Sequence, residues 1–177
     1  MEQEKSLAIS LPIQLSRLIS GLMFASVSIL AFFTPFFLGH PQWLVGMAVN
    51  ACLFLAATYL PRKYFIPLSI LPSLGVLARG LVFGPLTMFL VYFLPFIWLG
   101  NLILILAFKG LFLRTGYIAS AIVSAVAKFI FIFLIANIYF KLSVVPAVFL
   151  QAMGLNQLAT ALAGGFVAFI LFKAYAR

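Results

Sequence analysis

The sequence predicts an all-α membrane protein, a bundle of about six transmembrane helices with both termini in the cytoplasm. Hydrophobic side chains make up 66% of the 177 residues and charged side chains only 7%, whereas roughly a quarter of a soluble domain is charged. One core cannot hide so much apolar surface in a chain of this length, so we expect lipid to be the main solvent. We expect one membrane domain over residues 1–177, with 1–17 as a cytoplasmic N-terminal segment.

Apolar runs of nearly the right length for membrane spans recur along the chain. Crossing hydrocarbon takes about 20 apolar residues in a helix, and breaks at proline, glycine and charged residues divide the sequence accordingly. The predicted spans are residues 18–38, 43–60, 65–83, 93–110, 117–139 and 155–173. The runs lack the alternation that barrel strands need, which favours helices. The first run is too long for a signal peptide and follows an acidic segment, so we expect it to be retained.

Two apolar stretches do not fit a plain six-helix count. They are Leu81 to Tyr92, which a Gly-Pro pair interrupts, and Pro146 to Gly154. Pieces of this length cannot span, so each is expected to be a re-entrant or interfacial segment; the first lies between spans three and four. Prolines within or beside spans three and four predict kinked helices at Pro67, Pro72 and Pro95.

Basic residues predict the orientation in the membrane. Eight of the eleven fall on one side of the predicted spans: Lys5, Arg17, Arg62, Lys63, Lys109, Arg114, Lys173 and Arg177. The opposite connections contain one formal charge, Lys141. The positive-inside rule therefore predicts a multi-pass protein of the plasma membrane with both termini inside. The net charge of +9 does not indicate nucleic-acid binding, because the basic residues form no stripe.

Acidic residues are almost missing from the chain. There is no Asp, and the only two Glu are Glu2 and Glu4; His40 and Cys52 are single. Paired-carboxylate catalysis, zinc clusters and the usual intramembrane proton relays need groups that these spans lack. We therefore expect no enzyme, no metal and no cofactor, and any transport would take its energy from a partner.

Polar residues inside the spans gather in the predicted outer half. We estimate how deep each polar residue lies in the membrane from its position in its span, at about 1.5 Å per residue. Two cations and several amides lie at similar depths. The predicted substrate-binding residues are Arg79, Lys128, Asn50, Asn101, Asn156 and Gln157. Since charges at membrane depth are costly and neither cation has an acidic neighbour, an anionic solute, most simply a carboxylate, would supply the countercharge.

Structural roles for the same residues stay open. Arg79 is near enough to the interface to extend to the headgroups, and Lys128 could be uncharged or bond to backbone carbonyls. Each amide could instead hold two helices together, which is a common role for Asn and Gln in membranes.

Small residues four apart in span one, Gly21 and Ala25, offer a face on which another helix can pack. With six spans, two cytoplasmic ends, a polar outer half and Gly/Pro-rich third and fourth spans (Leu71–Gly75, Gly100–Asn101), the chain resembles the substrate-binding S components of energy-coupling factor transporters. The resemblance implies a vitamin or related micronutrient bound from outside. It also implies that Gly21 and Ala25 dock a membrane coupling subunit driven by two ATPase subunits, although that family has alanine at both places.

Two functions follow from the sequence. The first is a membrane-embedded solute-binding subunit of a micronutrient importer that partner subunits energise. The second is a structural or assembly membrane protein that recruits partners through its helix faces and binds no solute.

Overall fold

Helices account for nearly all of the described chain. The computed structural model describes residues 2–38, 40–80 and 87–175, which form helices and turns without a strand. The elements are α1 (Glu2–Phe37), α2 (Gln42–Tyr59), the short 3-10 helix η1 (Arg62–Tyr64), α3 (Phe65–Arg79), α4 (Thr87–Lys141), α5 (Val148–Ala152) and α6 (Leu155–Tyr175). The all-helical prediction is confirmed.

Four helical stretches among the described residues are long and apolar enough to cross a membrane. They are Leu15–Phe37, Gln42–Tyr59, Met88–Lys141 and Val148–Ala174. They are compatible with a membrane protein. α3 has 15 residues, fewer than the about 20 that cross the hydrocarbon. Residues 81–86, which hold the end of the predicted third span and half of the predicted re-entrant stretch, lie outside the described residues.

Helix α4 consists of two limbs that meet at Gly116. This glycine has φ +74° and ψ 177°, a backbone conformation that suits glycine and lets the chain reverse. The limbs, 87–115 and 117–141, run antiparallel: the rings of Phe93 and Tyr139 are 5.3 Å apart, and those of Phe108 and Tyr117 are 5.0 Å apart. The connection expected between residues 110 and 117 is therefore helical except at its end. Helical dihedral angles continue through Pro95, so the reversal in α4 is at the glycine.

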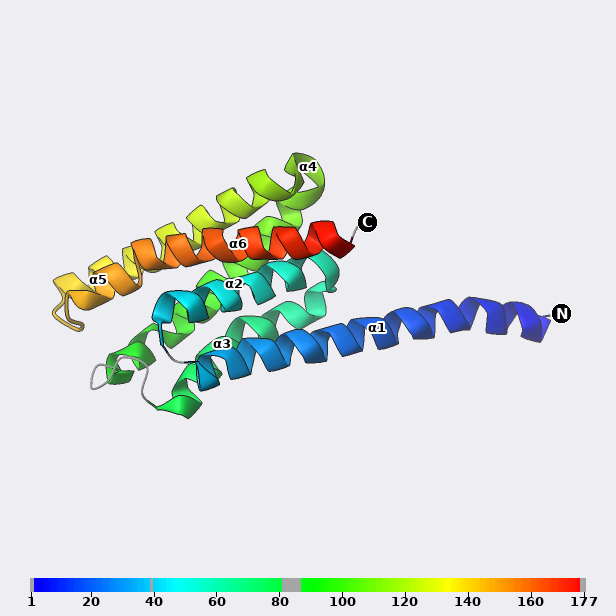
Figure 1. Cartoon of the computed structure of the whole chain (residues 1–177), viewed down its shortest axis with the longest axis horizontal. Helices are drawn as coiled ribbons and strands as arrows, with labels where there is room; N and C mark the ends of the chain where they lie inside the picture. Colours follow the sequence, from blue (N-terminus) through cyan, green and yellow to red (C-terminus); the bar gives the residue numbers. More distant parts are fainter. Residues whose placement is uncertain (1, 39, 81–86, 176–177) are drawn as a thin grey trace.

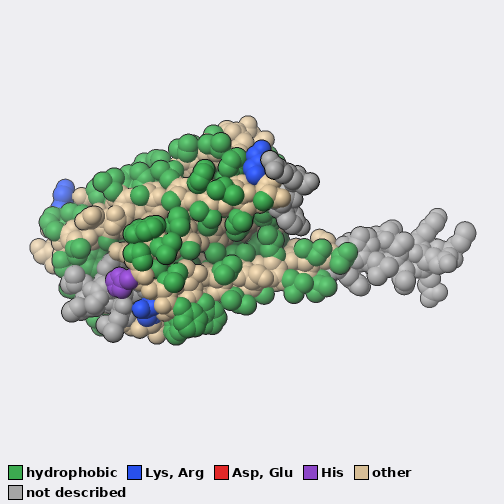
Figure 2. Space-filling view, viewed as in Figure 1, with side chains coloured by type: hydrophobic (Ala, Val, Ile, Leu, Met, Phe, Trp, Pro, Cys, Tyr) green, Lys and Arg blue, Asp and Glu red, His purple; other side chains and the backbone are tan. Residues whose placement is uncertain are grey.

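Successive helices run in alternating directions along one bundle (Figure 1). α1 packs mainly on α3, and α2 mainly on α6, while α4 contacts α2, α3 and α6. The N-terminal part of α1 extends beyond the other helices (Figure 1). Apolar side chains cover much of the visible face of the bundle, as expected for contact with lipid (Figure 2).

Glycines bring α2 and α6 into close contact. A methyl group added at Gly164 would lie 2.6 Å from the carbonyl oxygen of Met47 and 2.7 Å from Cβ of Asn50. One added at Gly46 would lie 2.9 Å from Cγ2 of Thr160. Small residues allow helix backbones to approach in this way. The contact places Asn50 of α2 beside Thr160 of α6.

The two ends of the bundle differ in charge. Because the helices alternate in direction, six described cations lie at one end, here called the basic end: Arg17, Arg62, Lys63, Lys109, Arg114 and Lys173. Arg79 and Lys141 lie toward the other end, which we call the pocket end because the cavity described below lies in that half.

Candidate functional site

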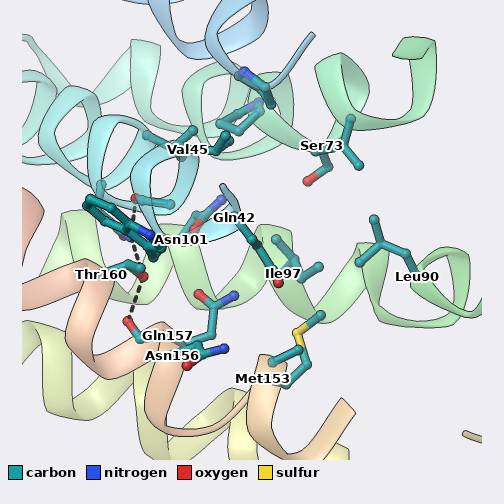
Figure 3. Close-up of a pocket in the computed structure, with 18 of the residues that line it drawn as sticks. Gln42, Val45, Ser73, Leu90, Ile97, Asn101, Met153, Asn156, Gln157 and Thr160 are labelled. Atoms are coloured by element: carbon teal, nitrogen blue, oxygen red, sulfur yellow. Dashed lines mark hydrogen bonds between the residues drawn. The ribbon is translucent and has the colours of Figure 1, made fainter. Parts of the chain in front are cut away.

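A cavity of about 130 Å³ lies between the helices in the half of the bundle toward the pocket end. Every helix from α1 to α6 contributes to its wall. The polar lining residues are Gln42, Asn50, Ser73, Asn101, Lys128, Asn156, Gln157 and Thr160. Apolar lining comes from Trp43, Val45, Val76, Leu90, Ile97 and Met153 among others. In Figure 3, Asn101, Thr160 and Gln157 gather at one side of the pocket and Leu90 lies at the other. The pocket therefore has a polar side and a more apolar side.

Lys128 is the one charged residue that lines this pocket in the described part of the chain. Its side chain is 3% exposed, and Nζ donates a hydrogen bond of 2.8 Å to Oδ1 of Asn50. Nδ2 of Asn50 donates in turn to the carbonyl oxygen of Gly46 at 2.8 Å and, at 3.5 Å, to Oγ1 of Thr160. The lysine is thus positioned by a neutral amide and has no acidic partner among the described residues.

The two acidic residues of the sequence are far from the pocket along the chain. Glu2 and Glu4 are in the first turns of α1, whereas the pocket meets the same helix at Pro35. That separation is roughly 45 Å along the helix axis at about 1.5 Å per residue. An ionised group that leaves water is expensive to bury unless it is paired. A ligand with a negative charge would provide the missing pairing.

Asn101 and Ser73 face the pocket from neighbouring helices. Asn101 donates through Nδ2 to the carbonyl oxygen of Ser69 at 2.9 Å, so its Oδ1 remains able to accept. The hydroxyl of Ser73 is buried, with 4% of the residue exposed, and has no hydrogen-bond partner among the described residues. Buried polar groups are nearly always paired, so this hydroxyl is unusual.

Asn156 and Gln157 begin α6 at the pocket. Both are partly exposed, and their side-chain amides make no hydrogen bond with another described residue. Figure 3 shows them extending from the helix start toward the space between α2, α4 and α6. They supply donors and acceptors that are free to bind a ligand.

Arg79 lies outside this pocket, although the sequence grouped it with the other five. Its guanidinium donates to the carbonyl oxygens of Phe36 at 3.0 Å and Phe37 at 2.6 Å. The last carbonyls of a helix lack partners within the helix and attract cations. Arg79 therefore caps the end of α1 and ties it to the end of α3.

The predicted docking residues Gly21 and Ala25 lie on an uncovered face of α1. A methyl group added at Gly21 would meet no described atom within 4 Å, and Ala25 is exposed. Both are therefore accessible to another helix or to lipid.

Three polar lining residues were missed by the sequence interpretation as site residues: Gln42, Ser73 and Thr160. The estimate of depth in the membrane could have included the hydroxyls of Ser73 and Thr160. Ser73, for example, lies at about the same depth in α3 as Asn101 does in the antiparallel first limb of α4. Hydroxyls are also common where helices merely pack closely, so depth alone would not have separated a site from a contact.

Family models, curated proteins and solved structures were compared with the chain, and none matches.

Proposed function

We propose that this protein crosses the plasma membrane six times, with both termini in the cytoplasm. The spans would be α1, α2, the sequence-predicted third span 65–83 that contains α3, the two limbs of α4, and α6, which alternate in direction along the bundle. Six described cations at the basic end, against two toward the pocket end, favour a cytoplasmic basic end by the positive-inside rule. The pocket would then lie in the outer half.

In this orientation, the pocket binds a small anionic solute from the outer side. The observation that carries this proposal is Lys128, a buried lysine on the pocket wall whose hydrogen-bond partner is a neutral amide. A carboxylate at this point would receive a charge-assisted hydrogen bond, which is stronger than a neutral one. Asn101, Asn156 and Gln157 offer neutral donors and acceptors around it.

We further propose that the protein is the solute-binding subunit of a micronutrient importer that partner subunits energise. The spans lack the carboxylates of a proton relay, which is consistent with an external source of energy. The resemblance of the predicted layout to that of S components of energy-coupling factor transporters supports this assignment. The uncovered face at Gly21 and Ala25 is where a membrane coupling subunit with its ATPase subunits would dock.

Replacing Lys128 tests the solute site. Purified protein should be stabilised against heating by butanoate, pentanoate or benzoate and not by butan-1-ol at the same concentration. Lys128→Met should abolish the carboxylate effect in protein that is still monodisperse. Lys109→Met is the matched control, because Lys109 also lies within α4 but donates to the carbonyl oxygen of Thr58 at the basic end.

The site is disproved if wild-type protein responds to no carboxylate, or if folded Lys128→Met responds as wild type does. Should Lys128→Met not fold, Lys128→Gln retains a donor for Asn50 while removing the charge. It should lose carboxylate binding as well.

The second candidate function, a structural or assembly protein without a solute, is favoured by another observation. The polar groups also join helices: Lys128 of α4 to Asn50 of α2, and Asn101 of α4 to the backbone of α3. If this is their whole role, Lys128→Met will lower thermal stability, and no carboxylate will stabilise either protein.

A further inference from the structure

The unpartnered hydroxyl of Ser73 has a structural cause. In an α-helix a serine can donate to the carbonyl four residues earlier, which here is that of Ser69. That oxygen accepts from Nδ2 of Asn101 in addition to its helical N–H donor, and a carbonyl oxygen has two lone pairs. The carbonyl of Ser69 is therefore already occupied, and Ser73 does not bond to the carbonyl three residues earlier either, so its hydroxyl has no partner among the described residues.

Ser69 provides a contrast on the same helix. Its hydroxyl is equally buried, with 2% of the residue exposed, but donates to the carbonyl oxygen of Ile66 at 2.7 Å. Ser69 does not line the pocket, whereas Ser73 does, and the Ser73 oxygen points into the open space in Figure 3. Of these two serines, the one that faces the cavity is the one with spare hydrogen-bonding capacity.

The number of charges on the wall limits the charge of a ligand. Lys128 is the one charged group among the lining residues that the structure describes, since Arg79 is bound to the end of α1. A single negative charge is matched by this cation. A second carboxylate in the same space would be buried without a partner, which is strongly unfavourable.

The size of the cavity limits the ligand as well. Its volume of about 130 Å³ is close to that of engineered cavities of about 150 Å³ that bind benzene. A ligand of roughly six to nine non-hydrogen atoms is the corresponding size class. Apolar side chains such as Leu90, Ile97 and Met153 favour a hydrocarbon body between its polar groups.

We infer that the pocket takes a compact monocarboxylate that also carries one neutral hydrogen-bonding group, with the carboxylate at Lys128 and the neutral group at Ser73. This inference rests on the proposed solute site and adds the ligand's charge, its size and a second point of recognition. Ser73 is then a specificity-determining residue on α3, across the pocket from the residues of α6.

Straight-chain acids of four to six carbons test the inference in three forms. The first form is the unsubstituted acid: butanoate, pentanoate and hexanoate. The second carries a terminal hydroxyl: 4-hydroxybutanoate, 5-hydroxypentanoate and 6-hydroxyhexanoate. The third carries a second carboxylate at the other end: succinate, glutarate and adipate. Affinities are measured by calorimetry on the detergent-solubilised full chain. At least one hydroxy acid should bind about threefold to tenfold tighter than its parent acid, the gain typical of one added hydrogen bond. Every dicarboxylate should bind more weakly than the monocarboxylate of equal length.

Two serine variants locate the effect. Ser73→Ala should remove the advantage of the hydroxy acid while the parent acid keeps its affinity. Its thermal midpoint should not fall, because no hydrogen bond is lost. Ser69→Ala is the matched control and should preserve the preference for the hydroxy acid.

The possible failures are distinguishable. If no parent acid binds wild-type protein, the solute site itself is wrong and this inference falls with it. If parent acids bind through Lys128 but no hydroxy acid is preferred, or Ser73→Ala keeps the preference, the role of Ser73 is refuted alone. Dicarboxylates that bind more tightly than monocarboxylates would overturn the single-charge inference.

Discussion

The two ends of the bundle differ in whether their polar side chains have hydrogen-bond partners. At the basic end, Lys109 donates to the carbonyl oxygen of Thr58, Tyr117 to that of Gly165 at 3.1 Å, and Thr58 to that of Phe54. At the pocket end, neither the hydroxyl of Ser73 nor the side-chain amides of Asn156 and Gln157 bond to another residue in the part of the chain that the structure describes. Polar side chains alone therefore do not make a site; they need space beside them.

Side-chain volume explains the difference. Stacked and edge-on rings fill the half of the bundle nearer the basic end, where Phe108 contacts Phe54, Phe112 and Tyr117 with ring centroids 5.0 to 5.4 Å apart. In the other half, rings also pack, as Phe93 does against Tyr139 and Phe149. Small residues such as Gly46 and Ala152 nevertheless line the wall beside the polar groups there, and a cavity remains. The contrast predicts that the rings around Phe108 stabilise the bundle without contacting a ligand in the pocket, so mutations can separate stability from recognition.

The largest effect on stability is expected from Phe108→Ala. Phe108 is fully buried, so removing its ring should cost about 3–5 kcal/mol, by analogy with cavity-forming substitutions in soluble cores. Unfolding in detergent, followed by circular dichroism, measures the loss. Phe166→Ala is the control, because that ring is exposed on α6. The folded fraction of Phe108→Ala should still bind carboxylates; loss of binding in folded protein would contradict the separation of the two ends.

An intermediate effect is expected where α2 meets α6. Gly164→Ala pushes a methyl group against Met47 and Asn50 and should destabilise the bundle by about 1–3 kcal/mol. It should also weaken carboxylate binding, because it displaces the amide that positions Lys128. Gly110→Ala is the matched control: no described atom lies within 4 Å of the added methyl group, and the change should be neutral or slightly stabilising. Equal behaviour of the two variants would show that the close contact does not shape the site.

The smallest effect is expected from Arg79→Gln. Losing its hydrogen bonds to the end of α1 should cost about 1 kcal/mol of stability. Carboxylate affinity should change by less than about twofold, since the guanidinium is outside the pocket wall and solvent ions screen it near the surface. Titration with pentanoate measures this. A tenfold loss of affinity would show that Arg79 takes part in binding, and would contradict the assignment of Arg79 to helix capping alone.

The helices were predictable because apolar runs and helix length are properties of contiguous residues. The reversal near residue 116 was predictable in place but not in form: a loop was expected, and one glycine with a positive φ suffices. The kinks expected at prolines were harder to judge, since a helix can continue through Pro95 when its neighbours satisfy the backbone.

Five of the six predicted binding residues line the cavity, and Arg79 does not. Depth says nothing about rotation around the helix axis, and rotation decides which neighbour a side chain meets. For Arg79 the neighbour is the carbonyl end of α1, more than 40 positions earlier in the chain.

The sequence by itself determined that this chain is helical, that its surface suits lipid, and that no carboxylate inside its predicted spans can balance a lysine. Those properties follow from composition and from the rise of a helix, which need no knowledge of neighbours. Only the tertiary structure decided that Lys128 meets Asn50, 78 residues away, and that Ser73 faces the cavity without a partner in residues 2–38, 40–80 and 87–175. Close packing at glycines sets how the helices are rotated against one another, and that rotation decides which polar groups pair and which remain free for a ligand.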